Sequence, residues 1–180
     1  MVVRENTAWP LTMPGKWQAF EAEVDGRLDA DRPLDAQNFD AVAIDIFRRS
    51  AAGETHESMK KSCPGYKEAI DAAMSEAEVV TLPGLTYLAY ENKIAVPAPL
   101  SPMEQRKSAQ LRRDRLTPLQ AIVLKAVCAD VYQGHIPRIL RDMAPDTPYI
   151  TTKVLRGKMT AADLPRLVGK AFAHGLFAPR

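Results

Sequence analysis

The segment DAQNFDAVAIDIFRRS, residues 35–50, carries the clearest helical pattern in the chain and decides the fold class. Its apolar residues recur every three or four positions, which places them on one face of a helix. Asp35 is expected to cap the start of this helix, and Arg48 and Arg49 suit the negative end of its dipole. The pattern predicts an amphipathic helix with these inward residues: Phe39, Val42, Ala43, Ile46 and Phe47.

Similar spacing on both sides of this segment extends the helical prediction through the N-terminal part of the chain. Helices are expected over residues 14–28 and 64–78, with a short helical turn over residues 54–62. The first of these helices places its larger apolar residues on one stripe, namely Trp17, Phe20, Val24 and Leu28.

Two capping boxes predict where helices begin in the C-terminal part. Ser101-Pro102-Met103-Glu104 and Thr117-Pro118-Leu119-Gln120 each combine a capping hydroxyl, a proline at the first helical position and an acid or amide at the third. The helices that they open are expected to end near Arg115 and at Gly134. Three more helices are predicted over residues 136–143, 148–156 (ended by Gly157) and 161–174 (ended by Gly175). We therefore expect a mostly α-helical protein.

The helical pattern is interrupted over residues 79–100, where three prolines and short apolar runs occur. Residues 86–90 and 94–96 are expected to form two small strands of a hairpin, the alternative being an extended, polyproline-like linker. We favour the hairpin because Tyr87 and Tyr90 indicate packing. The sequence thus predicts an acidic helical domain over residues 1–78, a hairpin or extended connector over 79–100, and a basic module of four or five helices over 101–180.

Charge is distributed unevenly between the two halves of the chain. Residues 1–100 hold 10 Lys and Arg against 16 Asp and Glu, whereas residues 101–180 hold 14 against 6. The formal net charge of +2 is therefore the sum of an acidic half and a basic half. A basic surface of this kind indicates an anionic partner for the C-terminal half.

No residue pattern in the chain indicates catalysis, a metal or a cofactor. The three histidines, His56, His135 and His174, have no metal-ligand spacing, and Cys63 and Cys128 are expected to be single thiols. Neither a phosphate-binding loop nor a nucleophile elbow occurs. Because no catalytic motif occurs, we expect that the protein is not an enzyme. No apolar run approaches the roughly 20 residues of a membrane span, so we also expect a cytoplasmic protein without a membrane partner.

Residues 149–158 (YITTKVLRGK) and 163–172 (DLPRLVGKAF) resemble the recognition helix and the following helix of the phage-repressor type of helix-turn-helix domain. The resemblance spans about residues 118–175. It implies a helix-turn-helix fold in which the third helix enters the major groove of DNA. It further implies that Thr151, Thr152, Lys153 and Arg156 face the DNA and that Lys158 lies near a phosphate.

These observations lead to two alternative functional hypotheses. The first is a non-enzymatic, DNA-binding transcriptional regulator or accessory factor that contacts duplex DNA through the C-terminal half, with Arg106, Arg112 and Arg113 adding backbone contacts. Residues 15–78 would then mediate self-association or bind a protein partner. The second is a helical adaptor or inhibitor, of the kind found in phages and plasmids, that acts by protein contact alone without touching nucleic acid.

Overall fold

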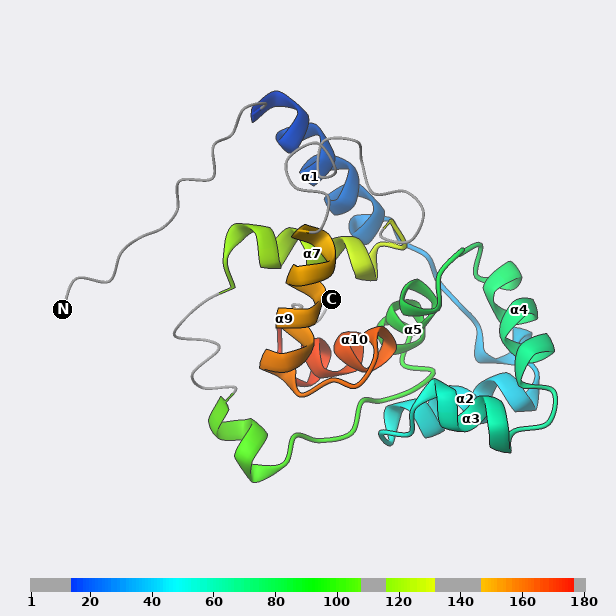
Figure 1. Ribbon diagram of the computed structural model, residues 1–180. Helices are drawn as coiled ribbons and strands as arrows, with labels where there is room; N and C mark the ends of the chain where they lie inside the picture. The colour runs from blue at the N-terminus through cyan, green and yellow to red at the C-terminus, as the bar shows by residue number, and fades with distance from the viewer. Residues whose placement is uncertain (1–13, 108–115, 132–146, 177–180) are drawn as a thin grey trace.

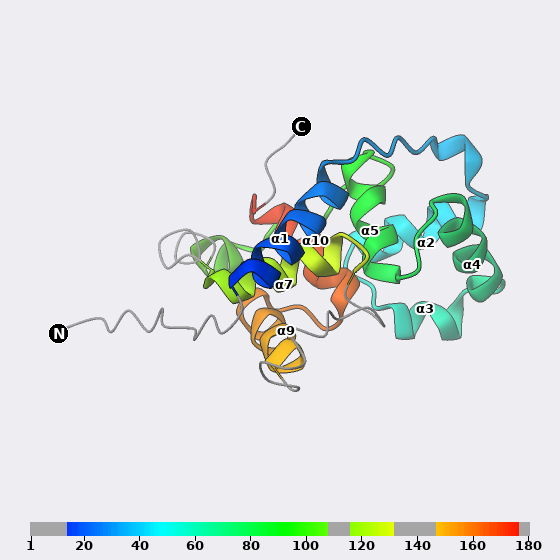
Figure 2. The ribbon, with the colours of Figure 1, turned by 90° about the horizontal axis from the view of Figure 1, so that it is seen from above.

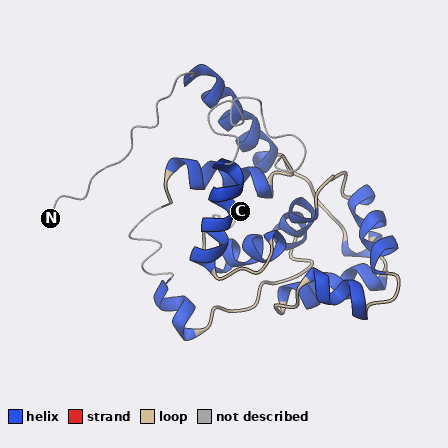
Figure 3. Cartoon of the chain, in the orientation of Figure 1, coloured by secondary structure: helices blue, strands red, loops and turns tan. Residues whose placement is uncertain are grey.

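The computed structural model describes residues 14–107, 116–131 and 147–176 (Figure 1). Regular structure in these ranges is entirely helical, as Figure 3 shows, so the predicted mostly α-helical class is confirmed. The elements are α1 (Pro14–Asp29), a 3-10 turn η1 (Ala36–Asn38), α2 (Ala41–Ala51), α3 (His56–Ser62), α4 (Tyr66–Glu76), α5 (Leu82–Glu91), a helical segment over residues 102–107, α7 (Pro118–Cys128), α9 (Thr147–Met159) and α10 (Leu164–Ala173).

Helices α5 and α10 form the centre of the described structure. They pack against each other more extensively than any other described pair, and Phe172 of α10 lies with its ring centroid 5.4 Å from that of Tyr87 and 5.6 Å from that of Tyr90. Figures 1 and 2 show α2, α3 and α4 on one side of this pair and α1, α7 and α9 on the other. The apolar faces of both groups are therefore buried in one core around α5 and α10.

Helix α2 forms where the apolar spacing predicts it, and Ala43, Ile46 and Phe47 are buried. Its N-terminal cap is Asp40 and not Asp35, because the Asp40 carboxylate accepts a hydrogen bond from the Ala43 N–H at 2.7 Å. Asp35 instead caps the preceding turn η1 by accepting from the Gln37 N–H. The two aspartates therefore cap two successive helical elements, η1 and α2. Helix α2 begins after Asp40, more than one turn later than expected.

The predicted hairpin over residues 86–96 is wrong, because residues 82–91 form helix α5. Thr81 caps this helix by accepting from the Gly84 N–H at 3.1 Å, and Pro83 lies in the first turn, where proline is tolerated. Every residue from Pro83 to Tyr90 is buried. A helix that is buried on all sides has no polar face, so the periodicity that identifies a surface helix is missing.

Helices from the predicted acidic domain and the predicted basic module contribute to the same hydrophobic cluster. Helix α1 packs on α7, and α10 packs on both α2 and α5. The Lys125 ammonium of α7 also lies 2.7 Å from the Asp25 carboxylate of α1, which joins the two halves by an ion pair. Residues 79–100 thus supply a core helix between the halves, where a hairpin or extended connector was expected.

The C-terminal helices keep their predicted order but differ in length from the prediction. Helix α7 ends at Cys128, short of the predicted end at Gly134, and Asp130 takes a left-handed φ of 62° just after it. Helix α9 continues through Gly157 to Met159, and Thr160 ends it with a φ of 54°. The predicted end of α10 is confirmed, since Gly175 has a φ of 67°. The helix predicted over residues 136–143 lies outside the described residues.

Both predicted capping boxes are present. In the second box the Thr117 hydroxyl accepts from the Gln120 N–H, and the Gln120 side chain accepts from the Thr117 N–H, each at 3.2 Å. In the first box Ser101 and Glu104 make the same reciprocal pair. The sequence signature therefore locates these two helix starts correctly.

We predict that Thr117→Ala lowers the free energy of unfolding by about 1 kcal/mol, because α7 loses the acceptor for its Gln120 N–H. Thr117→Ser keeps a capping hydroxyl and should lie within about 0.5 kcal/mol of the natural protein. Urea denaturation followed by circular dichroism measures both values. Equal stability of the alanine and serine variants would show that this cap contributes nothing.

Candidate nucleic-acid interface

Helix α9 has one buried face and one exposed face. Thr151, Thr152, Leu155 and Met159 point into the core, where α9 packs on α7 and α10. The exposed face, which we call the α9 face, consists of Lys153, Val154, Gly157 and Lys158. These four residues form two pairs at i, i+4 spacing, so they line adjacent rows along one side of the helix.

Two cations of α9 hydrogen-bond to uncharged groups in the described part of the chain. Lys158 Nζ donates to the Gln120 side-chain oxygen at 3.1 Å, and the Arg156 guanidinium donates to the backbone carbonyls of Ala161 and Ala162. No residue of α9 is acidic. Among the residues that the structure describes, Lys153, Arg156 and Lys158 therefore form no ion pair, and their positive charge is not cancelled locally.

Two other cations of the C-terminal half are neutralised by carboxylates. Lys125 pairs with Asp25 at 2.7 Å, and Lys170 pairs with Glu104 at 2.5 Å. Side-chain exposure is only 17% for Lys170 and 13% for Glu104. Hydrogen bonds from Lys170 hold the pKa of Glu104 at about 2, so this pair stays ionised at neutral pH. Among the described C-terminal residues, α9 thus carries three cations without a carboxylate partner, and the others without one are Arg106, Lys107 and Arg166.

Steric access to the α9 face is favourable for a large ligand. A Cβ atom added to Gly157 would have no atom within 4 Å, and this glycine is exposed in the middle of the face. Val154 retains 40% exposure beside it. A phosphate backbone can therefore approach α9 closely between Lys153 and Lys158.

The structure places the predicted DNA-contacting residues in three different environments. Lys153 and Lys158 are exposed on α9, and Arg156 is half-buried beside them; Arg106 is exposed on the 102–107 segment. Thr151 and Thr152 are each only 5% exposed, so the expectation that they face DNA is incompatible with their positions here. Arg112 and Arg113 lie outside the described residues.

The burial of the two threonines changes which side of α9 is exposed. Val154 is apolar and yet exposed, whereas Thr151 and Thr152 take inward positions. The exposed side of α9 therefore differs from the side predicted to face DNA, and Lys153 and Lys158 belong to both. No spacing in the sequence singles out this face, because Val154 and Gly157 lie on it beside the two lysines.

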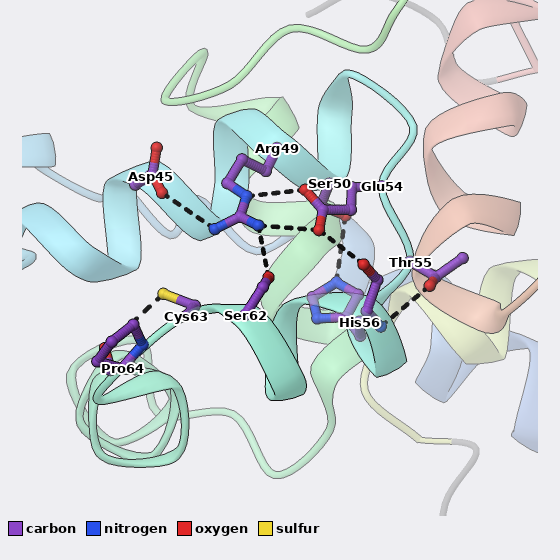
Figure 4. Close-up of polar contacts among 10 residues, drawn as sticks. Asp45, Arg49, Ser50, Glu54, Thr55, His56, Ser62, Cys63 and Pro64 are labelled. Atoms are coloured by element: carbon purple, nitrogen blue, oxygen red, sulfur yellow. Dashed lines mark hydrogen bonds and ion pairs between the residues drawn. The ribbon is translucent and has the colours of Figure 1, made fainter.

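A second polar cluster lies between α2 and α3, away from α9 (Figure 4). The Arg49 guanidinium makes two hydrogen bonds of 2.8 Å to Glu54 and one to the Ser62 hydroxyl, also at 2.8 Å. The pair with Arg49 is the main cause of the lowered pKa of Glu54. These contacts fix the tight connection from α2 to α3 and give no indication of a ligand.

Behind this cluster the buried His56 imidazole joins two hydroxyl groups. Its Nε2 lies 3.1 Å from Ser50 Oγ, and its Nδ1 lies 2.7 Å from Tyr66 Oη. Burial lowers the pKa of His56 and raises the pKa of Tyr66 to about 12, so both groups are neutral at pH 7. His56 therefore satisfies two buried hydroxyls, in agreement with a structural role.

The described residues offer no metal site and no disulfide. No group of three or more His, Cys, Asp and Glu side chains in these ranges could hold a metal ion. Cys63 and Cys128 are both free thiols, and burial raises the pKa of Cys128 well above its usual value. No described helix is long and apolar enough to cross a lipid bilayer.

Comparisons with known proteins gave no match to this chain, whether by family models, by curated sequences or by solved structures.

Proposed function

We propose that the chain is a non-enzymatic nucleic-acid-binding protein, a regulator or accessory factor that contacts duplex DNA through the α9 face. The observation that carries this proposal is the lack of any carboxylate partner for Lys153, Arg156 and Lys158 among the described residues. Cations that are not neutralised locally gain most when they replace the counterions of a phosphate backbone. The α9 face thus provides affinity that depends on charge and not on base sequence.

The packing of the C-terminal helices is consistent with a helix-turn-helix arrangement. Helices α7, α9 and α10 each pack against the other two, and α9 turns its basic side outward. In such domains an exposed helix enters the major groove, while neighbouring elements contact the backbone. We assign the groove-entering role to α9, with Lys153 and Lys158 as phosphate contacts; Arg106 is the candidate for an additional backbone contact.

The buried threonines change what this interface can read. Base edges are read by polar side chains that reach into the groove, and Thr151 and Thr152 face the core instead. Within residues 151–159, the part of α9 whose burial is described, the exposed residues are two lysines, a valine and a glycine. We therefore expect an interface dominated by phosphate contacts, with weak discrimination between sequences.

The double variant Lys153→Gln/Lys158→Gln should bind a fluorescein-labelled duplex at least about 10-fold more weakly than the natural protein at low salt. The matched control is Lys60→Gln/Lys61→Gln, which removes two exposed lysines of α3 and should change the Kd by less than about 2-fold. Fluorescence anisotropy titration measures all three affinities, with thermal melts to show that each protein is folded.

Two outcomes would reject the proposal. If both double variants lost affinity equally, binding would follow net charge and not the α9 face. If the natural protein did not bind duplex DNA at low salt, the adaptor hypothesis would replace the DNA-binding proposal. Residues 15–78 would then be the contact surface to test.

A further inference from the structure

A small cavity lies where the C-terminal end of α2 meets α10. Its volume is about 90 Å³, and it is lined by Ser50, Gly53, Tyr90, Arg166, Gly169 and Lys170, together with small apolar residues of α2 and of the segment after α5. A cavity of this volume exceeds the space that one ordered water needs. It is separate from the α9 face, since none of its lining residues belongs to α9.

Every polar side chain in the wall of the cavity carries a hydrogen-bond donor. The wall contains two cationic side chains, Arg166 and Lys170, and two hydroxyl groups, Ser50 and Tyr90, but no Asp or Glu. Arg166 and Lys170 lie four residues apart on α10, so both project to the same side of that helix. The composition of the wall therefore matches an anion and not a cation.

The Arg166 side chain lines this cavity. It lies against Gly53, where an added Cβ atom would be 3.5 Å from Arg166 Nη2. Among the described residues it has no hydrogen-bond acceptor and no ion-pair partner, although a guanidinium carries five N–H donors. Its neighbour Lys170 already pairs with Glu104, so Arg166 supplies the uncompensated charge.

The Ser50 hydroxyl is held in place by the buried histidine network. Ser50 Oγ lies 3.1 Å from His56 Nε2, and Tyr90 lines the same cavity as Ser50. Burial raises the pKa of Tyr90 to about 12, so its hydroxyl keeps its proton at neutral pH and remains a donor. Asp163 is also near this network, but its carboxylate accepts from the backbone N–H groups of Arg166 and His56.

We infer that this cavity binds a phosphate group, with Arg166 as the charged ligand, Tyr90 and Ser50 as hydroxyl contacts and Lys170 at the edge. Arginine matches the geometry of phosphate oxygens by donating two parallel N–H bonds, and such charge-assisted bonds are stronger than neutral ones. The group would be either free inorganic phosphate or the terminal phosphate of a monoester, because both present the same oxygen atoms to this wall.

Isothermal titration calorimetry of the full chain with inorganic phosphate tests the inference, with chloride at equal ionic strength as the reference titration. A parallel titration with adenosine monophosphate distinguishes the two sources, since a monoester that binds more tightly indicates a phosphorylated metabolite. Saturable binding at one site is expected for phosphate. Heat that rises without saturation, and equally for chloride, would overturn the inference.

Variants then locate the site. Arg166→Gln removes the charge and should weaken phosphate binding at least about 10-fold, because hydrogen bonds to charged groups are the strongest contacts here. Tyr90→Phe preserves the ring and should weaken binding several-fold, which keeps the test decisive if Arg166→Gln fails to fold. Arg48→Gln is the matched control, since Arg48 is an exposed arginine of α2 outside the cavity wall.

Equal phosphate affinity of Arg166→Gln, Tyr90→Phe and the natural protein would overturn the assignment. Failure of this site is distinguishable from failure of the proposed DNA interface: Lys153→Gln/Lys158→Gln should retain full phosphate binding, and Arg166→Gln should retain binding to duplex DNA.

Discussion

Replacing Glu104 by glutamine is expected to lower the free energy of unfolding by about 3 kcal/mol at pH 7, because it leaves the Lys170 ammonium without its carboxylate. Both side chains are largely buried, with exposures of 13% and 17%, so water replaces the lost partner poorly. The pair joins the helical segment 102–107 to α10. Its loss therefore weakens the attachment of that segment to the core.

The contribution of this pair depends on pH in a defined direction. The pKa of Glu104 in the folded protein is about 2, below its ordinary value of 4.5, so the folded state favours the ionised carboxylate. The stabilisation is complete above pH 4.5 and decreases as the pH falls from 4.5 toward 2. The stability difference between the natural protein and Glu104→Gln should shrink over that interval.

Urea denaturation of both proteins between pH 3 and pH 7 measures this difference. Glu57→Gln is the matched control, because Glu57 pairs with Lys61 on the surface of α3 with side-chain exposures of 71% and 75%. Glu57→Gln should change the free energy of unfolding by less than about 0.5 kcal/mol, because exposed ion pairs usually contribute little to stability. If the Glu104 and Glu57 variants were equally stable at pH 7, the buried pair would have no special role.

Replacing Gly84 by alanine is expected to destabilise the protein by about 1–3 kcal/mol, the usual cost of an added atom in a packed core. An added Cβ would lie 2.7 Å from Asp130 Cβ and 2.8 Å from Asp130 Oδ1. Asp130 has little freedom to move, because it is buried and its other carboxylate oxygen accepts from the Val80 N–H at 2.8 Å. Gly84 thus allows α5 to approach the turn that follows α7.

The control for this variant is Gly26→Ala in α1, where an added Cβ meets no atom within 4 Å. Alanine stabilises an exposed helix interior relative to glycine by about 0.5–1 kcal/mol, so the control should raise stability. The two alanine variants should differ by about 1.5–4 kcal/mol in urea denaturation. A Gly84→Ala protein as stable as Gly26→Ala would show that α5 does not approach Asp130 this closely.

Local signals in the sequence predict most of the described helices, since their caps and apolar periods involve neighbouring residues. The capping boxes at Ser101 and Thr117 and the terminator Gly175 are examples. Helix α5 escaped prediction because burial on all sides removes its polar face. Its Thr81 cap followed by Pro83 was the available signal.

The candidate site was predictable only in part. The charge of Lys153, Arg156 and Lys158 is a property of the sequence, but which side of α9 faces the core depends on its packing against α7 and α10. That packing buries Thr151 and Thr152 and exposes Val154. Likewise, Ser50 and Arg166 are 116 positions apart, and only the contact between α2 and α10 brings them to one cavity.

The salt dependence of duplex binding tests the proposed α9 interface most directly. Each neutralised phosphate contributes about −0.9 to the slope of log affinity against log salt concentration, so Lys153, Lys158 and Arg106 together should give a slope of about −2.7. Lys153→Gln/Lys158→Gln should reduce the magnitude of the slope of the natural protein by about 2. An unchanged slope in that variant, with both proteins folded, would contradict the assignment of α9 as the surface that binds nucleic acid.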